Sequence, residues 1–373
     1  MKKRVIITAV LVTIAAILVY LVLSEKPVET KLQEPALPYP YHSEDVTFTN
    51  NQADVTLSGT LTLPEKGDKF PVVILVSGSG PQDRNSEFWG HKPFLVIADY
   101  LTRQGIAVLR YDDRGIGKST GQFMEATSND FATDAESAVA YLKTRKEIDP
   151  EKIGVAGHSD GGLVAAIAAS RSKDIGFIIS LAGPGARGIE VISLQSELIA
   201  RAGGASKEEI AVIRKLNGKT VEILTKTTDT TRLRTELTAF FQKNMNSYPA
   251  KGLPPGFTKE QLFTAQVNAM CTPWYQYMFS IDPADFFSKV SCPVLALNGA
   301  KDLQVDAQQN LPVIEKAVKA GGNTNVTVKS LPDLNHFFQT SKTGHPSEYA
   351  GNTETFSPVA LAAMSDWISA QVK

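Results

Sequence analysis

Ile153-Gly-Val-Ala-Gly-His-Ser-Asp-Gly-Gly162 joins an apolar, strand-like run to an alanine-rich, helix-like run. Its centre fits the pattern G-x-S-x-G, which places a serine on a tight turn when a strand precedes it and a helix follows. Glycines are needed on both sides because side chains would collide there. The start of the helix also offers backbone N–H groups to developing negative charge. The segment therefore predicts an exposed nucleophile, Ser159, rather than a glycine-rich turn with an incidental serine.

Outside this turn, short apolar runs alternate with longer amphipathic runs. Strands that are apolar on both faces belong to a parallel sheet covered by helices on both sides. The alternation predicts a mostly parallel, doubly wound α/β sheet, and partial alternation at 45–49 and 55–63 predicts a hairpin before it. The strand-like runs are 72–76, 106–109, 153–156, 177–181, 294–297 and 326–328, and the helix-like runs are 94–103, 131–143, 162–170, 307–320 and 358–371.

One long interval interrupts the alternation. Between Pro184 and Val294 there is no convincing strand-like run, and helical runs occur at 190–201, 207–216, 233–244 and 259–270. An interval of about a hundred residues is too long for a simple loop. We therefore expect a helical cap at 186–288, inserted into a core formed by 44–185 and 289–373.

Two further motifs accompany the turn, Ser77-Gly-Ser-Gly-Pro-Gln-Asp-Arg84 and Arg110-Tyr-Asp-Asp-Arg-Gly-Ile-Gly-Lys-Ser119. As a set, the three segments resemble the α/β-hydrolase superfamily. The resemblance is closest to bacterial hydrolases of the serine-aminopeptidase-like or cinnamoyl-esterase-like carboxylesterase kind, and it covers about residues 45–373. It implies the α/β-hydrolase fold with an inserted cap, and a serine hydrolase that uses no cofactor or metal ion.

A serine hydroxyl needs a histidine base and usually a carboxylate that orients the base. Among the five histidines, His336 follows the last apolar strand, where the resemblance places the base; His345 and a purely structural His336 remain alternatives. For the acid, Asp302 follows the strand that ends in Asn-Gly, the layout of the family. Asp306 is expected to cap the next helix, and Asp333 lies too near the histidine along the chain. The order serine, aspartate, histidine is that of the fold.

Acyl transfer also needs two preorganised donors for the oxyanion. One is expected to be the N–H of Asp160, directly after the nucleophile. The other is expected to be the N–H of Ser79, in the loop 77–80, although Gly80 is not excluded because the His-Gly motif common in the superfamily is missing there. A phosphate cradle at this loop is disfavoured because no Gly-Lys-Ser/Thr follows. His158, in the strained turn, is expected to point away from the hydroxyl and to be structural.

Charge is balanced along the chain. Lys and Arg number 38 and Asp and Glu 39, so no overall field favours nucleic acid or an anionic surface. The charged residues in the motifs 83–84 and 112–114 are predicted to form structural ion pairs rather than substrate contacts.

The N-terminus differs from the rest. Three basic residues precede an uncharged run, 5–23, which could span roughly 28 Å as a helix. We expect 1–24 to be an uncleaved membrane anchor rather than a signal sequence, and 25–43, with four prolines, to be a tether. The basic end would lie in the cytoplasm and the catalytic body outside, or the body would be secreted or periplasmic if the segment is cleaved. Two cysteines, Cys271 and Cys292, are expected to be reduced and buried, although export would permit a disulfide.

Three functions follow from these features. A carboxylesterase that cleaves a small acyl ester comes first, a peptidase or amidase with the same serine second, and a catalytically silent, membrane-tethered binding protein third. An aromatic-rich stretch at 274–279 is expected to pack inside the cap rather than line a pocket.

Overall fold

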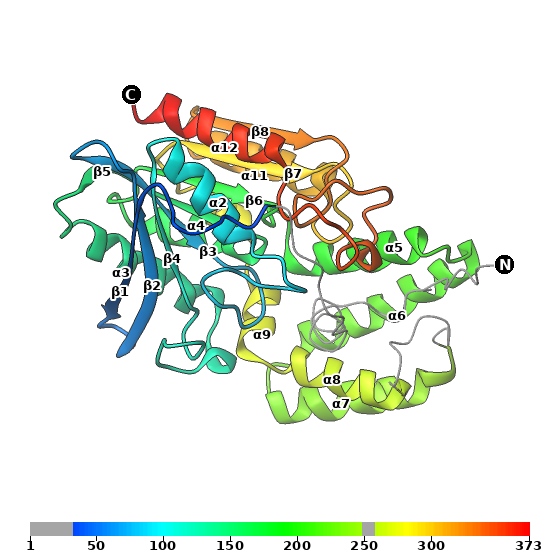
Figure 1. Ribbon diagram of the computed structural model, residues 1–373. Helices are drawn as coiled ribbons and strands as arrows, with labels where there is room; N and C mark the ends of the chain where they lie inside the picture. The colour runs from blue at the N-terminus through cyan, green and yellow to red at the C-terminus, as the bar shows by residue number, and fades with distance from the viewer. Residues whose placement is uncertain (1–32, 248–257) are drawn as a thin grey trace.

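A single eight-stranded sheet forms the centre of the molecule in the computed structural model, which describes residues 33–247 and 258–373 (Figure 1). The strand order is β1-β2-β4-β3-β5-β6-β7-β8. The first hairpin and the β2–β4 pair are antiparallel, and all other pairs are parallel. This confirms the predicted mostly parallel sheet. The strands are β1 (His42–Asn50), β2 (Val55–Leu63), β3 (Phe70–Val76), β4 (Ala107–Tyr111), β5 (Ile148–His158), β6 (Phe177–Leu181), β7 (Val294–Gly299) and β8 (Val326–Leu331).

Helices cover both faces of the sheet, and β3 shows why. Val72, Ile74 and Val76 enter one buried apolar cluster, whereas Val73 and Leu75 enter another. Side chains alternate between the faces of a strand, so a continuous apolar run supplies two cores at once. The first cluster contains residues of α3 (Ser128–Leu142), α4 (Asp160–Arg171) and α11 (Ala307–Ala320), and the second contains residues of α2 (Pro93–Arg103) and α12 (Pro358–Gln371).

Among the described residues, six α-helices lie between β6 and β7, to one side of the sheet (Figure 1). We call this segment the insertion. Most of its helices share an apolar cluster of their own, which includes Leu237, Phe241 and Tyr275. The last helix instead places Phe287 in the sheet's apolar cluster that contains Val72, Ile74 and Val76. The helices are α5 (Gly188–Ala202), α6 (Lys207–Lys226), α7 (Thr230–Asn244), α8 (Lys259–Met270), α9 (Pro273–Ser280) and α10 (Pro283–Phe287).

Two features of the insertion differ from the sequence prediction. Helix α6 continues past residue 216, its predicted end, and includes Gly218. This glycine does not end the helix, because it has open space around it and a single glycine costs a helix only about 1 kcal/mol. Helices α9 and α10 were not predicted. Each begins with proline at its first position, after a residue whose side chain caps the helix, Thr272 or Asp282. Capping followed by proline is a start signal that reveals such short helices when their apolar pattern does not.

The N-terminal end of the described chain contacts the body. Gln33 accepts from the backbone N–H of Thr355 at 2.6 Å, and the Tyr41 hydroxyl donates to Asp99 at 3.0 Å. This stretch is the described part of the predicted tether. The predicted anchor at 1–24 lies outside the described residues. Within 33–247 and 258–373, none of the helices has the length and apolar character needed to cross a membrane. Both cysteines are free thiols.

Candidate active site

The predicted nucleophile turn lies between β5 and α4. Ser159 has φ 55° and ψ −121°, a backbone conformation that residues other than glycine rarely adopt. The flanking glycines leave no room for a Cβ atom: one added at Gly157 would lie 1.8 Å from the Gly161 carbonyl oxygen, and one at Gly161 would lie 2.4 Å from that of Val76. These contacts give the physical reason for the G-x-S-x-G pattern.

The three side chains singled out from the sequence form one hydrogen-bonded line. His336 Nε2 lies 3.1 Å from Ser159 Oγ, and His336 Nδ1 lies 2.8 Å from Asp302 Oδ2. The other carboxylate oxygen of Asp302 accepts two backbone N–H groups, at 2.8 and 3.0 Å. The carboxylate accepts a hydrogen bond from Nδ1–H of His336. The other ring nitrogen, Nε2, then carries no proton and can accept the proton of the serine hydroxyl.

This line is built from the ends of three strands. Ser159 follows β5, Asp302 lies in the turn after β7, and His336 lies in the loop after β8. The carboxyl ends of parallel strands meet at one edge of the sheet, which is where open α/β sheets place their sites. Asp302 and His336 are almost fully buried, whereas Ser159 is partly exposed.

The alternatives left open by the sequence have other partners. His345 Nδ1 lies 2.8 Å from a neighbouring serine hydroxyl, and burial lowers the pKa of this histidine. Asp306 caps α11 by accepting from the Gln309 N–H at 2.8 Å. Asp333 pairs with Lys301. None of the hydrogen bonds found for these three side chains within the described residues reaches Ser159.

His158 supports the histidine loop, and none of the hydrogen bonds found for its ring within the described residues reaches Ser159. Its Nε2 lies 2.9 Å from the backbone oxygen of His336, and the two rings are 4.8 Å apart. Burial, with a smaller contribution from His336, lowers the pKa of His158 to about 3. The ring is therefore neutral at physiological pH and donates to this oxygen. The sequence held no signal for this contact, since the residues are 178 positions apart.

The loop that was predicted to supply an oxyanion donor passes beside the nucleophile. A Cβ at Gly78 would lie 3.1 Å from Ser159 Cβ, and Ser79 follows immediately. The other predicted donor, Asp160, is the first residue of α4. The N–H groups of a helix's first turn have no partner within the helix. The roles of Ser79 and Asp160 as donors stay predictions.

Acidic residues after β4 hold this loop. Arg84 donates to both oxygens of Asp112, at 3.0 and 2.8 Å, which confirms a structural ion pair between the two motifs. Asp113 has a different partner set: its Oδ1 lies 2.5 Å from Ser77 Oγ, and its Oδ2 accepts the Gln82 N–H at 3.0 Å. Burial raises the pKa of Asp113 to about 8. The start of the loop is therefore fixed by a carboxyl group that is largely protonated at neutral pH.

The raised pKa of Asp113 makes stability depend on pH. The unfolded chain releases this proton near pH 4, whereas the folded chain keeps it up to about pH 8. The folded state therefore binds more protons in this window, and its free energy of unfolding falls as the pH rises from about 4 to 8. We expect Asp113→Asn, which cannot titrate, to lose this slope in urea unfolding series. Asp68→Asn, at an exposed position, should keep it; an unchanged slope in Asp113→Asn would contradict the assignment.

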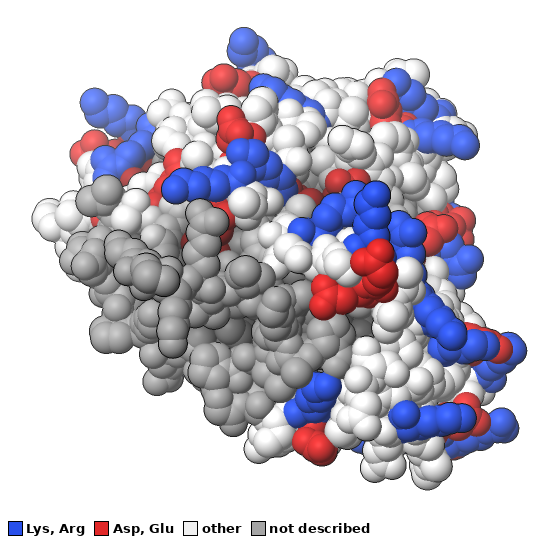
Figure 2. Space-filling view, turned by 90° about the vertical axis from the view of Figure 1, so that its right-hand side faces the viewer, with Lys and Arg blue, Asp and Glu red and all other residues white. Residues whose placement is uncertain are grey.

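Within the two described ranges, no cluster of three or more His, Cys, Asp or Glu side chains is arranged to hold a metal ion. On the face seen in Figure 2, acidic and basic side chains are interleaved over its described part. Within the insertion, Arg214 of α6 forms an ion pair with Glu197 of α5 at 2.6 Å.

The chain is similar in sequence to known hydrolases. A family model described as "Serine aminopeptidase, S33" matches residues 92–243, a span that includes Ser159 but ends before Asp302 and His336. Esterase EstD of Thermotoga maritima is 28% identical over 309 residues, which are 83% of this chain and 63% of EstD. The chain thus spans less than two thirds of that relative.

Solved structures show the same fold at low identity. The esterase Pf2001 of Pyrococcus furiosus has a TM-score of 0.53 at 18% identity, with 89% of this chain and 92% of that chain covered. The α/β-hydrolase GrgF from Penicillium sp. sh18 has a TM-score of 0.53 at 17% identity, with 88% and 99% covered. The strand order, the nucleophile turn and these similarities show that the chain has the α/β-hydrolase fold.

Proposed function

We propose that the chain hydrolyses carboxylic esters through an acyl-enzyme formed on Ser159. The observation that carries this proposal is the hydrogen-bonded line from Ser159 through His336 to Asp302, which is the arrangement that activates a serine hydroxyl. Three residues from distant parts of the chain meet at the distances that proton transfer requires. The resident groups supply a nucleophile, a base and a carboxylate without a cofactor.

The first half of the reaction acylates the enzyme. Ser159 Oγ attacks the carbonyl carbon while its proton moves to His336 Nε2, and Asp302 stabilises the imidazolium through Nδ1–H. The N–H groups of Ser79 and Asp160 are proposed to donate to the oxyanion. When the intermediate collapses, the bond to the leaving alcohol breaks and Nε2 gives its proton to the alcohol oxygen.

The second half regenerates the enzyme. A water molecule attacks the acyl carbon and gives its proton to His336 Nε2. Collapse of the second intermediate breaks the bond to Ser159 Oγ, which takes the proton back, and the carboxylic acid leaves. His336 thus acts as base and then acid in each half.

Ester substrates are favoured by one comparison and amides by another. EstD, which matches most of this chain, is named an esterase. The family model that matches 92–243 is described as a serine aminopeptidase, so cleavage of an aminoacyl amide is the second candidate. The same side chains serve both reactions, because only the leaving group differs.

A comparison of substrates separates these candidates. The full-length chain in detergent is assayed with p-nitrophenyl esters of increasing acyl length and with aminoacyl p-nitroanilides. We expect kcat/KM for the best ester to exceed that for the best anilide by about 10²-fold or more. A preference for the anilides would support the peptidase, and failure of a fluorophosphonate to label the protein would contradict both and favour a silent binding protein.

The place of the reaction is part of the proposal. The apolar run 5–23 with basic residues before it supports a membrane anchor with the hydrolase body outside the cytoplasm. Protease added to intact cells should then degrade the body, whereas full protection of the body would contradict this orientation.

A further inference from the structure

Asp160, the residue after the nucleophile, connects three parts of the fold through its side chain. Its Oδ2 accepts from Trp274 Nε1 of α9 at 2.8 Å, and both oxygens lie 3.0 Å from Ser128 Oγ at the start of α3. Asp160 is 5% exposed. Both neighbours donate into a buried acceptor, so the side chain is held in one position.

The charge on Asp160 makes these hydrogen bonds strong. Burial raises the pKa of this carboxyl to about 6, while the Trp274 and Ser128 bonds oppose the rise. At neutral pH the group is therefore mainly a carboxylate. Hydrogen bonds to an ionised acceptor are roughly twice as strong as neutral ones.

Helix α9, which carries Trp274, is anchored in the insertion. Tyr275 is buried in the insertion's apolar cluster and stacks on Phe279 with 4.9 Å between ring centres. Met278 lies against Gly188 at the start of α5, where a Cβ would come within 2.7 Å of the Met278 carbonyl oxygen. Helix α9 packs against α5, α6 and α8, and also against α3 of the core. It therefore joins the insertion to the turn that carries Ser159.

We infer that Trp274 is a positioning residue, which ties the Asp160 carboxylate to the insertion and thereby aims the Asp160 backbone N–H at the oxyanion. This inference rests on the proposed function, because the N–H acts only if Ser159 attacks a carbonyl. A donor contributes to catalysis only when it points to the position that the oxyanion occupies. A shift of α9 therefore changes the rate of the chemical step through this contact.

A single substitution tests the contact. Trp274→Phe removes the indole N–H and keeps an aromatic ring in α9. We expect kcat for the best ester to fall roughly 10-fold while KM changes less than about two-fold, because losing a whole oxyanion donor costs about 10²–10³. The rate of labelling by a fluorophosphonate should fall in parallel. A raised KM with unchanged kcat would overturn the inference and make Trp274 a substrate contact.

The chain offers a matched control at Trp367 of α12. Its ring packs edge-on against Phe177, and its buried Nε1 has no hydrogen-bond partner in the part of the chain that the structure describes. Trp367→Phe therefore removes an equal volume and an unused N–H. We expect a similar change in Tm to that in Trp274→Phe, with kcat unchanged. An equal loss of kcat in both variants would mean that general loosening is the cause, and would overturn the inference.

Two further experiments test whether Trp274 acts through Asp160, and the first of them does not need Trp274→Phe. Ser128→Ala removes one oxygen and the other donor to Asp160, so it should lower kcat in the same direction by a smaller factor, and an unchanged kcat would contradict the inference. In an Asp160→Ala background, Trp274→Phe should have no further effect on kcat, whereas additive losses would contradict action through Asp160. Absence of labelling in the unmodified chain would instead mean that the proposed function fails.

Discussion

Replacing Ser159 with alanine is expected to lower kcat for ester hydrolysis by about 10⁴-fold to 10⁶-fold while the fold stays intact. The substitution removes the attacking oxygen and the contact to His336 Nε2, which is 3.1 Å long. It leaves the bond between His336 and Asp302 in place. Alanine also keeps the Cβ atom of the turn, so the backbone at φ 55° carries the same strain as before.

Steady-state kinetics with a p-nitrophenyl ester and labelling by a fluorophosphonate measure this effect. Both signals should disappear in Ser159→Ala, with a circular dichroism spectrum and Tm close to those of the unmodified chain. His345→Asn serves as the control, because this histidine bonds within its own turn, and it should retain labelling. Full activity in Ser159→Ala would refute the proposed function.

The sequence predicted those parts of the site that depend on residues close to one another along the chain. The turn around Ser159 combines a strand, two sterically required glycines and a helix within ten residues, so its chemistry can be recognised without knowledge of distant contacts. Asp302 and His336 were predicted because each follows an apolar strand at a position where the resembled family places its acid and its base. The fold followed from the same apolar runs.

The supporting contacts could not be predicted, because each joins segments that are far apart along the chain. The ring of His158 meets the His336 backbone across 178 residues, and Trp274 meets Asp160 across 114. The aromatic stretch at 274–279 was expected to pack inside the insertion, and Tyr275 does so. Trp274 also packs against this cluster, as expected, and nothing in the sequence indicated that its indole N–H reaches Asp160 of the core.

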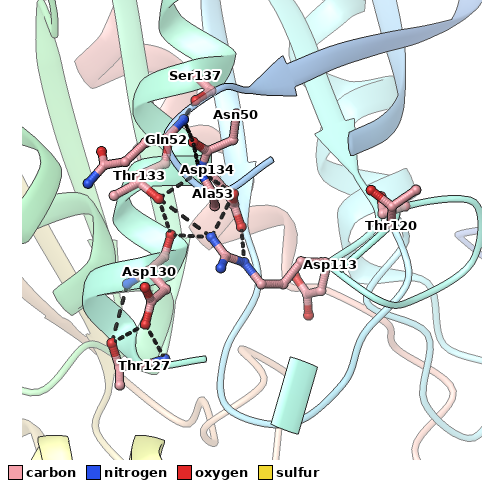
Figure 3. A network of polar contacts seen from close by, with 12 residues as sticks. Asn50, Gln52, Ala53, Asp113, Thr120, Thr127, Asp130, Thr133, Asp134 and Ser137 are labelled. Carbon is pink, nitrogen blue, oxygen red and sulfur yellow. Dashed lines mark hydrogen bonds and ion pairs between the residues drawn. The ribbon is translucent and has the colours of Figure 1, made fainter. Parts of the chain in front are cut away.

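One buried ion pair joins distant parts of the body. Arg114 donates from Nε to Asp134 Oδ2 at 2.8 Å and from Nη2 to Oδ1 at 2.9 Å. The side chains are 8% and 2% exposed. Asn50 of β1 donates to the same carboxylate, and the Asp130 carbonyl of α3 accepts from the guanidinium, as Figure 3 shows. The pair thus links β1, α3 and the loop after β4.

Removing the positive charge of Arg114 alone is expected to destabilise the fold strongly. In Arg114→Met the Asp134 carboxylate stays buried with Asn50 as its remaining donor, and the free energy of unfolding should fall by about 3–5 kcal/mol. Urea unfolding monitored by circular dichroism measures this loss. For comparison, Arg171→Met breaks an ion pair with Glu136 whose side chains are 37% and 28% exposed, and it should cost about 1 kcal/mol or less.

Removing both charges distinguishes the net contribution of the ion pair to the free energy of unfolding from the cost of burying one charge without its partner. In Arg114→Met with Asp134→Leu no ion is left without a partner, and Asn50 keeps its bond to the Thr133 hydroxyl at 2.7 Å. A buried pair gains little net stability once its desolvation is counted, so the double variant should recover most of the loss. A double variant as unstable as Arg114→Met would show that the attraction itself stabilises the fold. Because Arg114 adjoins Asp113, which holds the loop at Ser77, the recovered variant should regain kcat together with stability.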